Sequence, residues 1–213
     1  MQPSLPERYR GALLGLACGD AVGTTVEFQP RGSFQPLTDM VGGGPFHLKP
    51  GQWTDDTSMA LCLAESLLNK NAFDAADQMG RYLNWWQWGY LSSTGECFDI
   101  GMTVSQALDR YQQTGEPFAG STDPHSAGNG SLMRLVPVVL FYFPDARQIR
   151  RFAADSSRTT HAAPYRRFLD ELEDHMAEDA AEDTLKTVIS WARFGELFSY
   201  DDDAASFSLE NPT

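Results

Sequence analysis

The chain has 213 residues, a length that fits one domain with its own hydrophobic core. Hydrophobic residues make up 42% and charged residues 21%, as in an ordinary soluble globular protein. The formal net charge of −13 argues against duplex nucleic acid or an anionic membrane as a partner, because both require a basic surface. An anionic substrate would therefore be held by metal ions, helix N-termini or a few placed donors.

The cysteines and the absence of long apolar segments predict where the protein resides. Cys18, Cys62 and Cys97 are odd in number and unmatched in spacing, which is typical of reduced, partly buried thiols. The N-terminus lacks a secretion signal, and no apolar stretch is long enough to cross a bilayer. We expect a cytoplasmic protein without a membrane partner. The sequence does not indicate an oligomeric state.

Helical periodicity dominates the chain and predicts an all-α fold in one domain. The first helix runs from Glu7 to about Thr24, and the glycine- and proline-rich residues 28–51 predict a long loop. The apolar segment around Pro137 is a helix rather than a strand, because proline is rare inside strands and the alternation is missing. The later helices are predicted at 56–69, 74–89, 101–113, 130–141, 146–157, 164–179 and 184–198.

The strongest chemical signal is the pair Asp55–Asp56, which follows Thr54 at the start of the second predicted helix. Adjacent carboxylates repel each other unless a cation neutralises them. Capping of the helix explains one acid easily and a second less easily. Two interpretations therefore stand side by side: an acidic N-cap, or oxygen ligands of the kind that Mg²⁺ and Mn²⁺ prefer over Zn²⁺.

Two further acids lie on or just after the first helix. Asp20 is surrounded by small and apolar residues, so it requires a polar partner. For Asp20 we favour capping of a neighbouring helix over a role in chemistry. Glu27 stands at the helix exit beside the glycine-rich loop and is the better candidate for a site.

A polar loop and a histidine complete the candidates. Gly128 and Gly130 flank Asn129, and such a loop can point backbone N–H groups at an anion, helped by the start of the following helix. An ordinary turn explains the same residues equally well. His161 ends a polar run, where a histidine more often complements the helix dipole than contacts a ligand.

Taken in order, these segments resemble the ADP-ribosylglycohydrolase family, which includes the dinitrogenase reductase-activating glycohydrolases. The resemblance is clearest over residues 7–165, whereas 166–213 diverge or are shortened. It implies a single all-α orthogonal helical bundle over residues 1–213 with a shortened C-terminal part. The segments that carry it are 11–23, Glu27, 42–44, 49–59, 98–101, 127–134 and 160–161.

The resemblance also implies a function and a site. Family members hydrolyse the glycosidic bond between ADP-ribose and a protein side chain or small acceptor, using two Mg²⁺ or Mn²⁺ ions that activate water. The expected partner is thus an ADP-ribosylated protein or another ADP-ribose conjugate. The matching positions are Glu27 and Asp99 as catalytic residues, Thr54, Asp55 and Asp56 as metal ligands, and Ser126, Gly128, Asn129, Gly130 and His161 as substrate-binding residues.

The sequence departs from the family pattern in two places. A later glycine-flanked Asp-x-Asp-Thr segment, which supplies further metal ligands, is not found, and residues 201–203 are predicted to be a solvated acidic tail. Met102 stands where the nitrogenase-related branch has an asparagine near the acceptor, so the acceptor is not defined. We expect one bound cation and slow or absent hydrolysis. The alternative is an impaired ADP-ribose-binding protein or a structural relative.

Overall fold

The computed structural model describes residues 3–30, 32–123, 126, 128–162, 199–201 and 206–208. The chain divides into two compact units. The first comprises Met1–Thr122 and Gly128–Ala163, and the second comprises Asp123–Ala127 and Pro164–Thr213. The organisation of residues 1–213 as a single domain stays a prediction.

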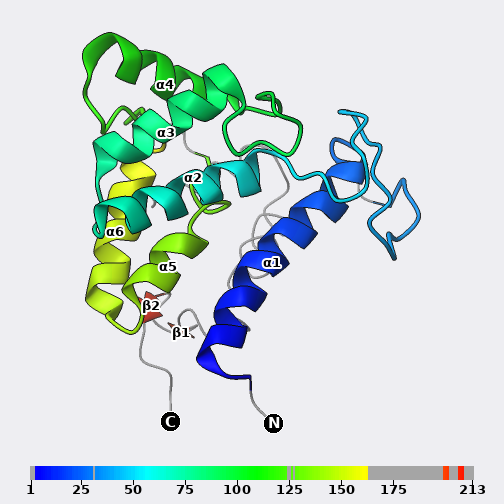
Figure 1. Ribbon diagram of the computed structural model, residues 1–213, viewed down its shortest axis with the longest axis horizontal. Helices are drawn as coiled ribbons and strands as arrows, with labels where there is room; N and C mark the ends of the chain where they lie inside the picture. Colours follow the sequence, from blue (N-terminus) through cyan, green and yellow to red (C-terminus); the bar gives the residue numbers. More distant parts are fainter. Residues whose placement is uncertain are drawn as a thin grey trace. The chain divides into compact units, whose positions relative to one another are not determined.

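The described part of the first unit is helical, which confirms the all-α prediction. Helices begin and end close to the predicted bounds, except in one segment treated below (Figure 1). The elements in chain order are α1 (Leu5–Gly23), the 3₁₀ helix η1 (Thr24–Val26), α2 (Asp55–Lys70), α3 (Ala75–Trp88), α4 (Met102–Thr114), α5 (Val136–Tyr142) and α6 (Ala146–Arg158).

The second unit contains a short antiparallel pair that the sequence analysis did not predict. Strand β1 (Ser199–Asp201) pairs with β2 (Ser206–Ser208), and Tyr200 lies opposite Phe207. Asp201, the first residue of the expected acidic tail, belongs to β1. The helices predicted at 164–179 and 184–198 lie outside the described residues, as do Asp202 and Asp203.

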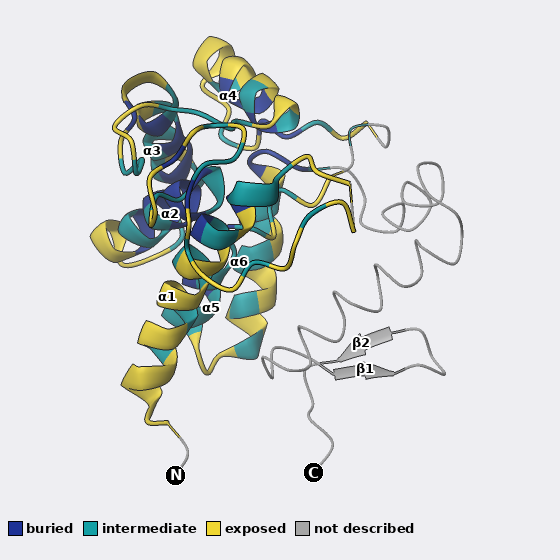
Figure 2. Cartoon of the chain, turned by 90° about the vertical axis from the view of Figure 1, so that its right-hand side faces the viewer, coloured by how far each residue is buried: buried dark blue, intermediate teal, exposed yellow. Residues whose placement is uncertain are grey.

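Helix α2 is the centre of the first unit. It packs against α1, α3 and α5, and its residues Met59, Leu63 and Leu67 are fully buried. Burying a leucine of this kind stabilises the fold by about 1.5–3 kcal/mol relative to leaving it exposed. In Figure 2, dark blue runs along α2 and α3, whereas much of α1 is exposed. Only Ala21 of α1 is fully buried, so α1 meets the bundle near its C-terminal end.

Helix α5 begins six residues later than predicted, at Val136 rather than at residue 130. Residues 130–134 form turns, in which the Leu132 N–H donates to the Asn129 carbonyl at 2.8 Å. Pro137 supplies the physical reason. Proline has no N–H to donate and fits only the first turn of a helix, so a helix that started at 130 would be broken there. The helical interpretation of this segment is confirmed, and its boundary was wrong.

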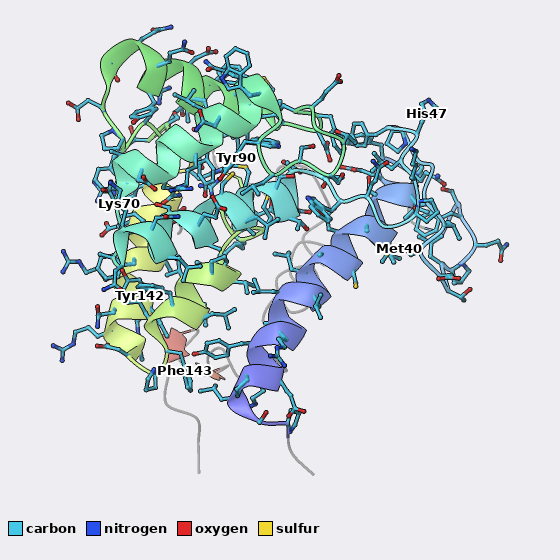
Figure 3. The ribbon with its side chains drawn as sticks, in the orientation of Figure 1. Met40, His47, Lys70, Tyr90, Tyr142 and Phe143 are labelled. Atoms are coloured by element: carbon cyan, nitrogen blue, oxygen red, sulfur yellow. The ribbon has the colours of Figure 1, made fainter. Side chains whose placement is uncertain are left out.

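Aromatic contacts tie α5 to its neighbours. The Phe73 N–H donates to the Tyr142 hydroxyl at 2.7 Å, across the loop between α2 and α3. The Tyr142 ring stacks on Phe152 of α6 with a centroid separation of 4.5 Å. Tyr142 lies at the end of α5 in Figure 3. These contacts hold the C-terminal end of α5 against α6 and the loop between α2 and α3.

The glycine-rich segment 28–51 is irregular, as predicted, and is anchored to the end of α1. Met40 and His47 mark it at the side of the bundle in Figure 3. Gly44 has φ +67°, and a Cβ there would lie 2.5 Å from the Thr24 carbonyl oxygen. The Thr25 hydroxyl donates to the Gly42 carbonyl at 3.2 Å. Only glycine permits this close approach, and the contact holds η1 and the residue after it, Glu27, in place.

The three cysteines are free: Cys18 is exposed, Cys62 buried and Cys97 half-buried. This agrees with the prediction of partly buried thiols. Within the described residues, none of the helices is both long enough and apolar enough to cross a membrane.

Candidate functional site

A cavity of about 720 Å³ opens in the first unit between the end of α1, the start of α2 and the start of α4. It brings together nearly all of the predicted site residues. Those that line it are Glu27, Thr54, Asp55, Asp56, Asp99, Gly128, Asn129, Gly130 and His161. Ser126 belongs to the second unit, where its hydroxyl donates to the Asp123 carbonyl at 2.7 Å.

Asp20 caps helix α2 from helix α1. Its Oδ2 accepts hydrogen bonds from the Thr57 N–H at 3.0 Å and from the Thr57 hydroxyl at 2.6 Å. Its Oδ1 accepts from the Thr54 N–H at 2.9 Å and from the Thr54 hydroxyl at the same distance. One carboxylate thus satisfies the first backbone donors of α2, which a helix cannot satisfy by itself. The expectation that Asp20 caps a neighbouring helix is confirmed.

The acidic N-cap interpretation of Asp55 and Asp56 was wrong. Thr54 is the N-cap residue and makes no cap bond of its own, because Asp20 takes that role. Burial, together with the charges of Asp56 and Asp99, raises the pKa of Asp55 to about 8. Burial also raises the pKa of Asp56 to about 6, together with the charges of Asp20 and Glu27. Asp55 and Asp56 are therefore partly shielded from water in the cavity, and neither caps the helix.

Glu27 and Asp99 face each other across the same cavity. Glu27 follows η1 and lies 3.4 Å from the Thr24 hydroxyl. Asp99 precedes α4 and has φ +58°, the left-handed conformation that aspartate tolerates better than most residues. Burial raises the pKa of Asp99 to about 7, and both the charge of Glu27 and a hydrogen bond with it contribute. Asp99 can therefore hold a proton near neutral pH, because a second charge beside Glu27 is unfavourable.

The acids suit a divalent cation in type, and they supply part of a coordination shell. Asp55, Asp56 and the Thr54 hydroxyl are hard oxygen donors at one helix start, and their raised pKa values show how unfavourable their charges are without a cation. Within the described part of the chain, no three histidine, cysteine, aspartate or glutamate side chains form a ready cation site. The donor set thus fits a cation that would need additional ligands.

Another part of the cavity wall is formed by His161 and the loop at 128–130. His161 is nearly buried and lies against the loop at 128–130, where a Cβ on Gly130 would stand 3.0 Å from the His161 Nε2 atom. Burial lowers the pKa of His161 to about 4, helped by the positive charge of Arg134. The ring is therefore neutral at pH 7. Its hydrogen bond to Thr160 replaces the predicted role as a helix-dipole partner.

A helix N-terminus does reach the cavity, but it is not the predicted one. The turns at 130–134 separate Asn129 from α5, so α5 does not offer its start to a ligand there. Instead, Gly101, Met102 and Thr103 at the start of α4 line the cavity, and Gly101 makes no side-chain cap. The unpaired N–H groups of a first turn favour a negative charge. Sequence reasoning predicted the helix at 101–113 but missed that its start reaches the cavity.

Arg134 was also missed as a functional residue. It belongs to the motif segment 127–134, yet the sequence suggested no role for it. In the structure it is fully buried, and its guanidinium lies 4.8 Å from the Tyr82 ring centroid. Its Nη2 donates to the Thr160 hydroxyl at 2.6 Å.

Comparison with known protein families gives one clear match. The family model described as ADP-ribosylglycohydrolase matches residues 1–198. A solved structure titled "ADP-ribosylglycohydrolase-related protein complex" is 43% identical to this chain with a TM-score of 0.64. The match covers 84% of this chain and 57% of that one.

Named relatives agree with this match. The ADP-ribosylarginine hydrolase Tri1 of Serratia proteamaculans is 47% identical over 161 residues, which are 74% of this chain and 43% of the relative. Tri1 of Pseudomonas putida is 50% identical over 135 residues, covering 63% and 36%. The ADP-ribosyl-[dinitrogen reductase] glycohydrolase of Rhodospirillum rubrum is 37% identical over 169 residues, covering 76% and 54%. The chain thus spans about half the length of these relatives or less.

Proposed function

Because the chain belongs to the ADP-ribosylglycohydrolase family, we propose that it hydrolyses the bond between ADP-ribose and the guanidinium group of an arginine side chain. Arginine is proposed as the acceptor because the relatives at 47% and 50% identity are named ADP-ribosylarginine hydrolases. Met102, where the sequence departs from the nitrogenase-related branch, is exposed and lines the cavity.

The observation that carries the proposal is that Asp20 caps α2, whereas the two acids after Thr54 do not. Asp20 satisfies the start of α2, so capping does not account for Asp55 and Asp56. Retaining two buried, mutually repelling carboxyl groups costs stability unless they serve a ligand. A cation on one wall and a phosphate group on the other are the ligands that this cavity suits.

The residues of the cavity take complementary roles in the proposed reaction. Water adds to the anomeric carbon of the ribose, the carbon–nitrogen bond to arginine breaks, and the leaving nitrogen gains a proton. Asp99, whose pKa is raised to about 7 beside Glu27, can give a proton and accept another near neutral pH. The negative charge of this pair also stabilises the oxocarbenium character that develops on the ribose. His161 and the loop at 128–130 hold the phosphate end.

A divalent cation, Mg²⁺ or Mn²⁺, completes this proposal. Thr54, Asp55 and Asp56 would hold the cation. Its positive charge would bind the ribose hydroxyl groups and lower the pKa of a water molecule. The resemblance implies two such ions. We propose one for these 213 residues, because the later group of aspartate ligands is not found in them.

The test is release of ADP-ribose from an ADP-ribosylated arginine peptide by the full 213-residue chain. We expect release in the presence of Mn²⁺ or Mg²⁺ and none after chelation. Asp55→Asn should lower the rate at least about 100-fold, since it removes a charge from the cation site. The matched control is Asp109→Asn, which changes an exposed aspartate on α4 and should leave the rate unchanged.

The same experiment separates the second candidate function. Within the described residues, no three histidine, cysteine, aspartate or glutamate side chains come together around one cation position. This favours a protein that binds ADP-ribose but hydrolyses its conjugates poorly. Calorimetry that detects ADP-ribose binding, without release at any divalent concentration, would establish that alternative. A chain that neither binds ADP-ribose nor releases it contradicts both.

A further inference from the structure

His161 lines the cavity, and one of its ring nitrogens is hydrogen-bonded inside the protein. Its Nδ1 lies 2.7 Å from the Thr160 hydroxyl oxygen. Its Nε2 edge lies beside the loop at 128–130, where even a methyl group on Gly130 would approach to 3.0 Å. A neutral imidazole carries a proton on only one nitrogen. What His161 offers to a ligand therefore depends on the partner of Nδ1.

Arg134 determines which way the Thr160 hydroxyl points. A guanidinium group can only donate hydrogen bonds, so the Arg134 Nη2, at 2.6 Å, occupies a lone pair of the Thr160 oxygen. Within the described residues, the only other hydrogen-bond neighbour of this oxygen is His161 Nδ1. The hydroxyl proton is therefore directed to Nδ1, which accepts it.

This arrangement places the imidazole proton on Nε2. We propose that Thr160, oriented by Arg134, is a positioning residue that holds His161 as its Nε2–H tautomer, so that it donates a hydrogen bond to a phosphate oxygen of ADP-ribose. The inference rests on the proposed function for the identity of the ligand. The tautomer itself is a property of the free protein.

The burial of Arg134 supports an indirect role. Its side chain is fully buried, so it cannot reach the ligand itself. No carboxylate within the described residues forms an ion pair with it, and its other contacts are Met59, Tyr82, Ser156 and Thr159. A buried guanidinium hydrogen-bonded to neutral groups is costly, even though the charge of Asp55 favours its protonated form, and it requires a compensating role. Polarising the chain from Thr160 to His161 is such a role, and it strengthens the Nε2–H donor.

The backbone of His161 is held rigidly enough for this purpose. Its N–H donates to the Ser157 carbonyl at 2.7 Å, and its carbonyl accepts from the Ser157 hydroxyl at 2.9 Å. On the other side it forms a bridge with Ser121. A Cβ on Gly120 would lie 2.8 Å from the His161 nitrogen, so this strand-like contact requires glycine.

The first test reads the tautomer directly. Long-range ¹H–¹⁵N spectra of the full chain labelled with ¹⁵N-histidine report which ring nitrogen carries the proton, and His161→Gln assigns the signals. We expect Nε2 to be protonated in the parent and in Thr160→Ser, which keeps the hydroxyl. Thr160→Val has the same shape without the hydroxyl and should give a mixture of tautomers. A parent ring protonated on Nδ1 overturns the proposal.

The second test links the tautomer to the ligand. Calorimetric titration with ADP-ribose should show about 10-fold weaker binding for Thr160→Val and unchanged binding for Thr160→Ser, which is the loss expected for one charge-assisted hydrogen bond. His161→Gln keeps an N–H near the Nε2 position, so adding Thr160→Val to it should weaken binding no further. Equal affinities of the parent and Thr160→Val overturn the proposal. Circular dichroism checks that each variant is folded.

The outcomes of the two tests distinguish a failure of the positioning role from a failure of the proposed function. If the parent does not bind ADP-ribose, the proposed function fails and the phosphate contact fails with it, while the spectra still decide the tautomer. If the parent binds and the spectra show no effect of Thr160→Val, the positioning role is wrong, and the release assay still decides the proposed function.

Discussion

At the scale of single residues, the distinction that matters is between acids that stabilise the fold and acids available for a ligand. Asp20, Asp55 and Asp56 all lie at the mouth of α2. Only Asp20 accepts hydrogen bonds from the backbone there. An aspartate therefore stabilises the fold at position 20, whereas the aspartates at positions 55 and 56 are available for a ligand. The hydrogen-bond partners of each carboxylate, rather than the residue type, make this difference.

Removing the Asp20 carboxylate should destabilise the whole fold. Asp20→Ala leaves the N–H groups of Thr54 and Thr57 without a partner, and we expect a loss of about 2–3 kcal/mol in the free energy of unfolding, measured with denaturant. Asp109→Ala, at an exposed position of α4, is the control and should change it by less than about 0.5 kcal/mol. Equal losses for the two variants would contradict the capping role.

His161 should make stability depend on pH in a defined window. Its pKa is lowered from 6.5 to about 4 by burial and by the facing charge of Arg134, so the unfolded chain binds a proton that the folded chain does not. The neutral His161 therefore contributes to the free energy of unfolding, by about 3 kcal/mol at most. This stabilisation is complete above pH 6.5 and is lost as the pH falls toward about 4. Unfolding free energies of the parent and His161→Gln should converge along this window.

His47→Gln is the control for that measurement, since it removes an exposed imidazole from the long loop. Its pH profile should run parallel to that of the parent. A constant difference between the parent and His161→Gln from pH 7 to pH 4 would show that His161 is protonated equally in both states.

At the scale of elements, the site is assembled by segments that are irregular rather than by helix faces. Glu27, Asp99 and the loop at 128–130 all lie between helices, while α2 supplies a fixed platform. Their positions depend on close backbone contacts, of which the one between Gly44 and Thr24 is the tightest near Glu27. Rigid helices with functional residues on well-anchored loops are a common division in enzymes.

A pair of glycine substitutions isolates this contact. Gly43 and Gly44 both have positive φ, so alanine is strained at either position, but only at Gly44 does the new Cβ meet the Thr24 carbonyl. We expect Gly44→Ala to cost about 1–3 kcal/mol more than Gly43→Ala in denaturant unfolding, and to slow ADP-ribose release by displacing Glu27. Similar stabilities of the two variants would show that the loop accommodates the methyl group.

At the scale of the whole molecule, charge makes stability depend on cations. The chain carries a net charge of −13, and three carboxyl groups with raised pKa values share one cavity. A ligand that binds only the folded state raises its stability by about 2.7 kcal/mol at 100 times its dissociation constant. A divalent cation should therefore stabilise the protein measurably.

We expect Mn²⁺ or Mg²⁺ to raise the melting temperature of the parent by several degrees relative to chelated protein. The double variant Asp55→Asn, Asp56→Asn should show no such rise, because it lacks the carboxylate ligands. The control is Asp109→Asn, which makes the net charge less negative by one and should respond like the parent. Equal rises for the parent and the double variant would assign the effect to general screening of negative charge.

Much of this could be predicted because the signals are local. Helical periodicity placed α1–α4 and α6, and the glycine-rich segment 28–51 is a loop. Asp74 and Asp145, a residue type that favours helix starts, cap α3 and α6. Pro137 also indicated that α5 begins close to it, but the apolar pattern of the preceding residues favoured the earlier start at residue 130. The strands β1 and β2 carried too little alternation in three residues each to be recognised.

The sequence by itself determined the kind of protein: helical, acidic, and carrying the motif residues Thr54, Asp55, Asp56, Glu27 and Asp99 in the order of one family. Only the tertiary structure decided which acid caps α2, because Asp20 and Thr54 are 34 residues apart in the chain and meet only when α1 packs on α2. The tautomer proposed for His161 depends likewise on Arg134, 26 residues before Thr160. Hydrogen bonds between distant residues leave no periodic trace in a sequence, and they decide what each motif residue is free to do.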